Sequence, residues 1–157
     1  MTINARGARC HCGRRGCLEM YASGIAIARL GRRLVGRRPK SLLAQMAREQ
    51  PLTAKLVHQA ADRGDESARD LIAGAGRDLG VGLASLINVF NPEVIVLDGS
   101  LTKMGDLYLG PARETAQRES FAQSWSDVRI VVGELGDRSA ALGAAAVALE
   151  AMRATAK

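Results

Sequence analysis

Three cysteines lie close together near the start of this 157-residue sequence. Cys10, Cys12 and Cys17 are the only cysteines in the chain, and all fall within the segment CHCGRRGC. Thiolates at this spacing are typical zinc ligands, and Gly13 and Gly16 between them let a loop fold tightly around an ion. Reduced structural cysteines and a redox-active thiol are the alternatives. Three thiols cannot pair completely, so a disulfide framework is not predicted.

A tetrahedral zinc site needs a fourth ligand beyond this cysteine trio. His11 lies between two of the cysteines, where the chain can hardly turn its imidazole onto the same ion. His58, the other histidine, belongs to a predicted helix further along the chain. We therefore expect the fourth ligand to lie outside the trio.

Two further segments place polar groups where a ligand could bind. Glu19 follows the last cysteine at a loop-to-helix junction. It either stabilises the first helical turn through the dipole or, on a stiffened loop, accepts hydrogen bonds from sugar hydroxyls. Gly99 and Ser100 end the segment VIVLDGS, between a predicted strand and the next helix, where backbone amides can approach a nucleotide. The glycines of GAGRDLG lie inside a predicted helix, which disfavours a nucleotide-binding turn there.

The apolar pattern predicts helices and strands in alternation after the cysteine loop. Helices are predicted over residues 19–35, 41–49 and 51–62, followed by a helix of roughly 25 residues that starts near Asp65 and ends at Asn91-Pro92. The segments EVIVLDGS and VRIVVG are predicted strands, separated by a helix over 105–119 and followed by one over 138–152. Crossovers of this length predict an α/β fold with parallel strand pairing.

Two strands are too few for this number of amphipathic helices. Isolated two-stranded sheets are marginally stable, and parallel sheets are normally covered on both faces. The remaining strands come from residues 1–9, from sequence outside this chain or from a partner copy. Sequence outside the chain is the favoured source.

Positive charge is concentrated in the first part of the chain. Residues 1–60 carry 12 Lys and Arg against two acids, whereas residues 61–157 carry 10 against 14. The densest segment, RLGRRLVGRRPK, has no interleaved aromatic residue to stack on bases, so it is interpreted as a solvated helix face. The sequence has no apolar run long enough to cross a membrane and no secretory signal pattern, so a cytoplasmic protein without a membrane partner is expected.

Three segments carry a family resemblance: CHCGRRGCLEMYASGIAIAR, LINVFNPEVIVLDG and LGDRSAALGAA. Together they resemble the ROK family of repressors, open reading frames and kinases over essentially the whole chain, and are closest to its glucokinase-like branch. The resemblance implies the actin-like ATPase fold, also called ribonuclease H-like, in which two α/β lobes close over a sugar and ATP. The chain would be the C-terminal lobe, with a zinc loop at 1–18, a helical segment at 19–63, a nucleotide-side core at 64–157 and an incomplete sheet.

The resemblance also implies roles for individual residues. The three cysteines match the family's zinc ligands, whose fourth member is a histidine expected upstream of Met1. Glu19 matches a glutamate that contacts the sugar, and Gly99, followed by Ser100, matches a glycine on the nucleotide side. Asp98 stands where such families often have glycine. A carboxylate there weakens nucleotide binding unless magnesium or an arginine intervenes.

The implied function is ATP-dependent phosphorylation of a hexose such as glucose or of an N-acetylhexosamine, with zinc, ATP and magnesium in the complete protein. These residues hold no counterpart of the kinases' catalytic aspartate or phosphate-binding hairpin, so the isolated chain is not expected to be catalytic. The alternative is the effector-binding lobe of a sugar-responsive repressor, which would bind nucleic acid only through an N-terminal helix-turn-helix. A homo-oligomer is expected in either case, because a missing lobe leaves an apolar face exposed.

Overall fold

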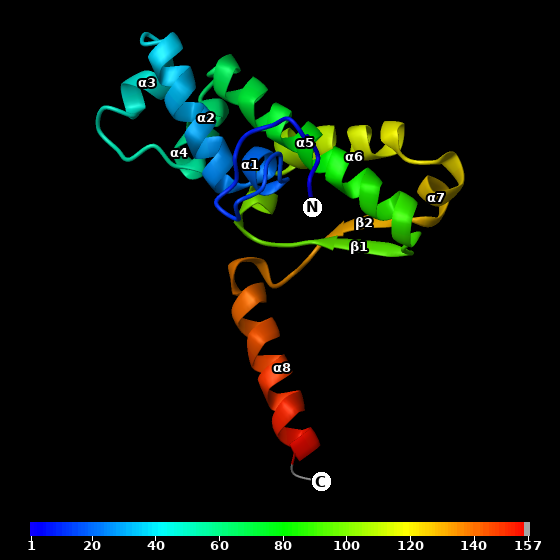
Figure 1. The fold of residues 1–157 in the computed structure, drawn as a ribbon. Coiled ribbons are helices and arrows are strands. Elements are labelled where there is room, and N and C mark those ends of the chain that lie inside the picture. The colour runs from blue at the N-terminus through cyan, green and yellow to red at the C-terminus, as the bar shows by residue number, and fades with distance from the viewer. Residues whose placement is uncertain (156–157) are drawn as a thin grey trace.

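A long central helix, α5 (Glu66–Phe90), organises the molecule (Figure 1). The computed structural model describes residues 1–155. Four helices, α1 (Glu19–Ala22), α2 (Gly24–Arg37), α3 (Leu42–Met46) and α4 (Ala54–Asp62), gather at one end of α5, and α6 (Asp106–Glu119) packs along it. Two short elements, η1 (Ser100–Met104) and α7 (Ala122–Asp127), flank α6. No helix in the described part of the chain is long and apolar enough to span a membrane.

The predicted 25-residue helix is confirmed, and Asp65, near which it was expected to start, is its N-cap. Asp65 is buried, and its Oδ1 accepts a hydrogen bond from the backbone N–H of Ala68 at 3.1 Å. Its Oδ2 accepts a second one, from the N–H of Leu43 at 2.8 Å, in the first turn of α3. One carboxylate therefore satisfies the free amides of two helices.

Asp65→Ala is expected to lower the free energy of unfolding by about 2 kcal/mol, because two amide groups lose their partner at once. Ser41→Ala is the matched control, since the Ser41 hydroxyl accepts only one such bond, from the N–H of Ala44 at 3.1 Å. That variant should lose about 1 kcal/mol or less. Urea denaturation of both variants measures the two losses in the free energy of unfolding. Equal losses would contradict the capping of two helices by Asp65.

The single helix predicted over 19–35 is wrong, because the chain breaks at Ser23. Ser23 has extended backbone angles, φ −85° and ψ 166°, between α1 and α2. Its hydroxyl donates to the carbonyl of Glu19 at 2.6 Å and accepts from the N–H of Ala26 at 3.1 Å. One side chain thus ends the first helix and caps the second. The Ser23 hydroxyl competes with the backbone hydrogen bonds of a continuous helix, which the apolar pattern of the sequence does not reveal.

The strand predictions are confirmed, as a two-stranded parallel sheet of β1 (Val94–Leu97) and β2 (Arg129–Val132). Val94 pairs with Arg129 and Leu97 with Val132. Residues 1–9 do not add a strand to this sheet, since their bridges run to the cysteine loop instead. The α/β class is therefore correct, with the sheet incomplete in the described chain.

Only one face of the sheet is covered. Ile95 and Ile130 pack against the cluster formed by α5 and α6, whereas Val96 on the other face is 60% exposed. The last helix, α8 (Ser139–Thr155), runs away from the rest of the molecule after the short turn η2 (Gly136–Arg138) (Figure 1). Leu142, Val147, Leu149 and Met152 are exposed along it. One face of the strands is therefore uncovered, as expected of an incomplete sheet.

Candidate functional site

Backbone pairing within residues 1–17 holds the cysteine loop together. Thr2 bridges to Cys17 and Arg9 to Arg15 in antiparallel fashion. Gly13 and Gly16 have φ values of 88° and 69°, which non-glycine residues rarely adopt, so both glycines predicted to tighten the loop do so. The chain between Cys12 and Cys17 can therefore turn back on itself.

The structure brings the three cysteine sulfurs together, with all ligand atoms within 4.8 Å of one another. The Sγ atoms of Cys12 and Cys17 are 3.5 Å apart. In a tetrahedral site with Zn–S bonds of about 2.3 Å, neighbouring sulfurs lie about 3.8 Å apart, so the spacing suits zinc. Within the described residues, no histidine, aspartate or glutamate joins the trio, and the fourth ligand stays a prediction.

The three thiols share hydrogen bonds in a way that favours a thiolate on Cys12. The backbone N–H of Arg14, followed by the thiols of Cys17 and Cys10, lowers the pKa of Cys12. The hydrogen bond to Cys12, followed by burial, raises the pKa of Cys17 to about 11. Because zinc binds thiolates, an ion here would have to displace the proton of Cys17.

Glu19 lies at the edge of a cavity of about 350 Å³ between the cysteine loop and α5. The cavity is bounded by Cys17 and Leu18 on the loop side and by Leu79 and Tyr108 on the opposite side. The Glu19 side chain is exposed, so its carboxylate is free to accept hydrogen bonds from a bound polar ligand. Because Glu19 is only two residues after Cys17, its carboxylate lies near the cysteine trio.

Gly99 and Ser100 line a second cavity of about 350 Å³, at the carboxyl end of β1. Gly99 has φ 105°, and a Cβ placed there would meet nothing within 4 Å. The backbone is therefore open to close approach by a ligand. Asp98 also lines this cavity, and its Oδ1 accepts a hydrogen bond from the N–H of Gly99 at 2.8 Å.

The two cavities share three wall residues, namely Ser23, Leu79 and Tyr108. The buried Tyr108 hydroxyl donates to the carbonyl of Ala22 at 2.6 Å, which ties α6 to the end of α1. Glu19 and the Gly99-Ser100 turn thus face adjoining spaces, although they are far apart in sequence. Sequence reasoning missed Tyr108, since its only signal was a lone aromatic residue in a predicted helix.

Tyr108→Phe is expected to lower the free energy of unfolding by about 1–2 kcal/mol, because the buried carbonyl of Ala22 loses its donor. Tyr21→Phe is the control, since the Tyr21 oxygen accepts a bond from the N–H of Ala8 in a less buried setting. Thermal or urea denaturation of both checks the difference. A larger loss in Tyr21→Phe would contradict the central position of Tyr108.

The burial of the Tyr108 side chain predicts that the protein loses stability at alkaline pH. Burial, with a smaller contribution from the Asp78 carboxylate, raises the pKa of Tyr108 from 10 to about 12. Because the folded state holds the neutral phenol, its stabilisation is present below pH 10 and is lost as the pH rises through 12. The free energy of unfolding, measured between pH 9 and 11.5, should fall less steeply with rising pH in Tyr108→Phe than in the parent chain.

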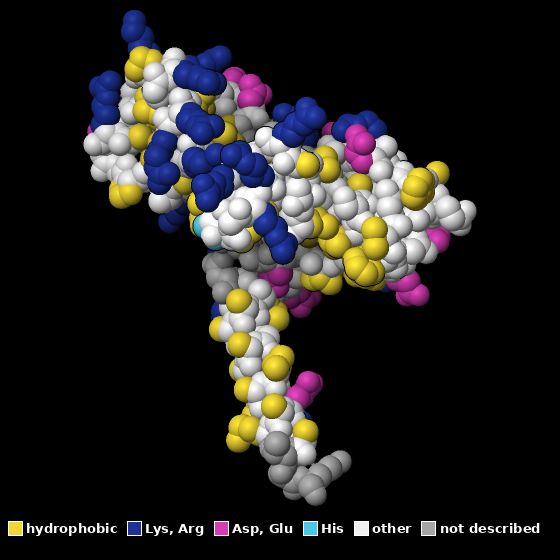
Figure 2. Space-filling view, viewed as in Figure 1, with side chains coloured by type: hydrophobic (Ala, Val, Ile, Leu, Met, Phe, Trp, Pro, Cys, Tyr) yellow, Lys and Arg dark blue, Asp and Glu magenta, His cyan; other side chains and the backbone are white. Residues whose placement is uncertain are grey.

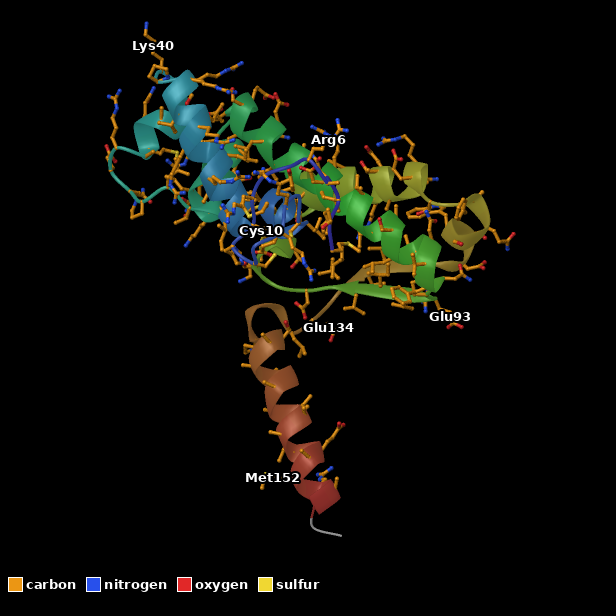
Figure 3. The ribbon with its side chains drawn as sticks, viewed as in Figure 1. Arg6, Cys10, Lys40, Glu93, Glu134 and Met152 are labelled. Carbon is orange, nitrogen blue, oxygen red and sulfur yellow. The ribbon has the colours of Figure 1, made fainter. Side chains whose placement is uncertain are left out.

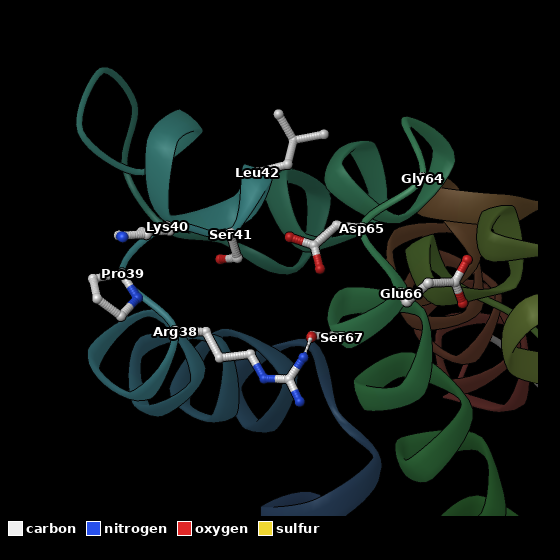
Figure 4. Close-up of a pocket in the computed structure, with 9 residues that line it drawn as sticks. All are labelled: Arg38, Pro39, Lys40, Ser41, Leu42, Gly64, Asp65, Glu66 and Ser67. Atoms are coloured by element: carbon white, nitrogen blue, oxygen red, sulfur yellow. Dashed lines mark hydrogen bonds between the residues drawn. The ribbon is translucent and has the colours of Figure 1, made fainter.

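A larger cavity, of about 570 Å³, lies elsewhere, between the α2–α3 turn and the start of α5 (Figure 4). Two of its charged groups have structural partners: Asp65 caps two helices, and Arg38 donates to the Ser67 hydroxyl at 2.6 Å. None of the residues predicted to bind a ligand lines it. The adjoining pair of smaller cavities is therefore the better candidate site.

Comparison with known proteins identifies the family of the chain. The ROK family profile matches residues 1–151. The xylose repressor of Caldicellulosiruptor bescii is 31% identical over 96% of this chain and 38% of its own length. The glucokinase of Halalkalibacterium halodurans is 34% identical over 87% of this chain and 42% of its own length. The chain belongs to the ROK family.

A solved structure supports the same assignment. The ROK family glucokinase from Streptomyces griseus, determined in complex with glucose and AMPPNP, superposes with a TM-score of 0.76 and 29% identity, covering 88% of this chain and 46% of that protein. The fold is that of an actin-like ATPase lobe, as predicted. The chain spans between 35% and 47% of the length of the curated relatives it matches.

Proposed function

We propose that this chain is the C-terminal lobe of a ROK sugar kinase that transfers the γ-phosphoryl group of ATP to a hexose such as glucose or to an N-acetylhexosamine. The observation that carries the proposal is the shared wall of Ser23, Leu79 and Tyr108 between the two cavities. Phosphoryl transfer requires the sugar hydroxyl and the γ-phosphate of ATP to lie next to each other. Two cavities that share a wall would place the two substrates in this way.

Each site residue has a role in this proposal. The Glu19 carboxylate accepts hydrogen bonds from sugar hydroxyls, and the open backbone at Gly99 and the neighbouring Ser100 receive the nucleotide. Zinc on the cysteine trio stiffens the loop that precedes Glu19. ATP and magnesium act in the complete protein, whose other lobe supplies the catalytic aspartate. The isolated chain should therefore bind its ligands without phosphorylating the sugar.

Saturation-transfer NMR of the chain with glucose and with N-acetylglucosamine tests the sugar side. We expect binding that Glu19→Gln weakens at least about tenfold, because the neutral amide is a poorer acceptor for hydroxyl groups. Glu49→Gln, on an exposed residue outside either cavity, is the matched control. Equal binding by both variants would remove Glu19 from the site, and robust ATP-dependent turnover by the isolated chain would contradict the lobe assignment.

A specific observation favours a second candidate, the effector lobe of a sugar-responsive repressor. Asp98 places a carboxylate in the cavity that the kinase would use for phosphates, where it repels them. A repressor needs only the sugar cavity. Affinity for an ATP analogue separates the two: measurable binding that Asp98→Asn strengthens fits a kinase, whereas no binding by either protein fits a repressor.

We also propose that the chain associates with itself. Val96 and its strand partner Val131 on the open sheet face are 60% and 38% exposed, and Val147 and Leu149 on α8 are 67% and 55% exposed. Apolar faces of this kind are normally covered by a partner. Light scattering over a range of concentrations should show dimers or larger species, and a monomer at every concentration would contradict the proposal.

A further inference from the structure

The arginines of α2 form a surface that the proposed function does not use. Arg32, Arg33 and Arg37 are exposed, and Lys40 follows directly after the helix. The opposite side of α2 is buried in the core, where Ile27 is fully covered. Figure 2 shows Lys and Arg side chains gathered over α2 and the N-terminal loop, and Figure 3 places Lys40 and Arg6 at separate points along this region. We call Arg6, Arg32, Arg33, Arg37 and Lys40 the basic face.

No acidic side chain of α2 itself offsets the charge of the basic face. The helix contains no acidic residue, so Arg33 and Arg37, one turn apart, repel each other. Asp70 and Asp78 line a groove of about 390 Å³ together with these two arginines. Within the described residues, however, no ion pair involves a Lys or Arg of residues 1–60. The positive charge is left for an external anion.

The chemistry of the basic face favours a ligand that presents phosphate groups in a rigid array. Ten of the 12 cationic residues in positions 1–60 are arginines, whose planar guanidinium groups bind phosphate oxygens in pairs. Arg33 and Arg37 lie about one helical turn apart along α2, and a duplex carries one phosphate per about 3.4 Å along each strand, so the two side chains can reach different phosphates. No aromatic residue lies between positions 22 and 60, so stacking on single-stranded bases is not available.

A membrane surface fits less well. Helices that bind bilayers insert an apolar face, and the apolar side of α2 is already packed against α4 and α5. Ile25 is the exposed large apolar residue of α2. We infer that the basic face binds the phosphate backbone of a nucleic-acid duplex without reading its bases. This binding is independent of the sugar and nucleotide cavities.

Fluorescence anisotropy with a labelled 20-base-pair DNA duplex of mixed sequence tests the inference between 50 and 200 mM KCl. Five phosphate contacts predict a slope of about −4.5 for the logarithm of the binding constant against the logarithm of salt concentration. The variant R32Q/R33Q/R37Q should lower the slope by about 3 in magnitude and weaken binding at 50 mM KCl more than tenfold. Its circular dichroism spectrum should be unchanged, because all three side chains are exposed.

The matched control is R113Q/R118Q/R129Q, which removes the same charge from α6 and β2 and should keep the parental slope. Equal losses in both triple variants would mean that only net charge matters, and would overturn the inference. So would the lack of saturable binding at 50 mM KCl. Tighter binding to phosphatidylserine vesicles than to the duplex, with the same dependence on the α2 arginines, would assign the face to a membrane instead.

Discussion

Gly80→Ala should destabilise the chain by roughly 2–3 kcal/mol, because a methyl group there has no room. A Cβ on Gly80 would lie 2.5 Å from both the carbonyl oxygen of Ala112 and the Cβ of Thr115, on the neighbouring helix α6. Gly76 meets the backbone of Tyr108 in the same way. Backbone atoms cannot rotate aside, so the two helices would have to separate along the wall that carries Tyr108.

Gly74→Ala is the control within the same helix. Its Cβ would meet only the flexible end of Arg77, at 3.7 Å. Alanine is the better helix former, so this variant should gain about 0.5–1 kcal/mol. Urea denaturation of both variants measures the difference in their free energies of unfolding. Similar stabilities for Gly74→Ala and Gly80→Ala would contradict the close α5–α6 packing.

Loss of one thiolate should abolish metal binding. The purified chain is expected to contain about one zinc ion, with its thiols protected from titration, and Cys10→Ser should weaken the affinity for zinc by more than about 100-fold. Serine matches the cysteine in size but is a poor zinc ligand at neutral pH. Elemental analysis together with thiol titration measures both quantities.

His11→Ala is the matched control for the metal site. The residue is exposed and stands apart from the sulfur cluster, so its variant should keep the metal. Loss of zinc in His11→Ala would place the imidazole among the ligands. A parental chain with no zinc and three reactive thiols would contradict zinc binding by the trio.

Much of the fold could be predicted from sequence because long periodic segments dominate it. The helix Glu66–Phe90 and the strands Val94–Leu97 and Arg129–Val132 follow directly from their apolar patterns. The break at Ser23 and the short helix Ala122–Asp127 were missed, because hydrogen bonds of single side chains or short turns decide them. The incomplete sheet was also predicted, and the described chain covers only one side of it.

In the candidate site, too, features with a local sequence pattern could be predicted and those made by long-range contacts could not. The spacing of Cys10, Cys12 and Cys17 predicted a cluster, and the three sulfurs do meet. Gly76 and Gly80 of the segment GAGRDLG, which were not assigned to nucleotide binding, prove to be contact points for α6. The adjoining cavities could not be predicted, because Tyr108 reaches Ala22 across 86 positions of sequence. Such long-range contacts leave no local pattern.

Amide chemical-shift mapping by NMR tests the central claim, that sugar and nucleotide occupy adjoining cavities of one lobe. The labelled chain is titrated with glucose, with a non-hydrolysable ATP analogue, and with both. We predict that glucose shifts resonances around Glu19, the analogue shifts those of Gly99 and Ser100, and both shift those of Leu79 and Tyr108. Shifts confined to regions outside the two cavities, or no response in the shared wall to either ligand, would contradict the account.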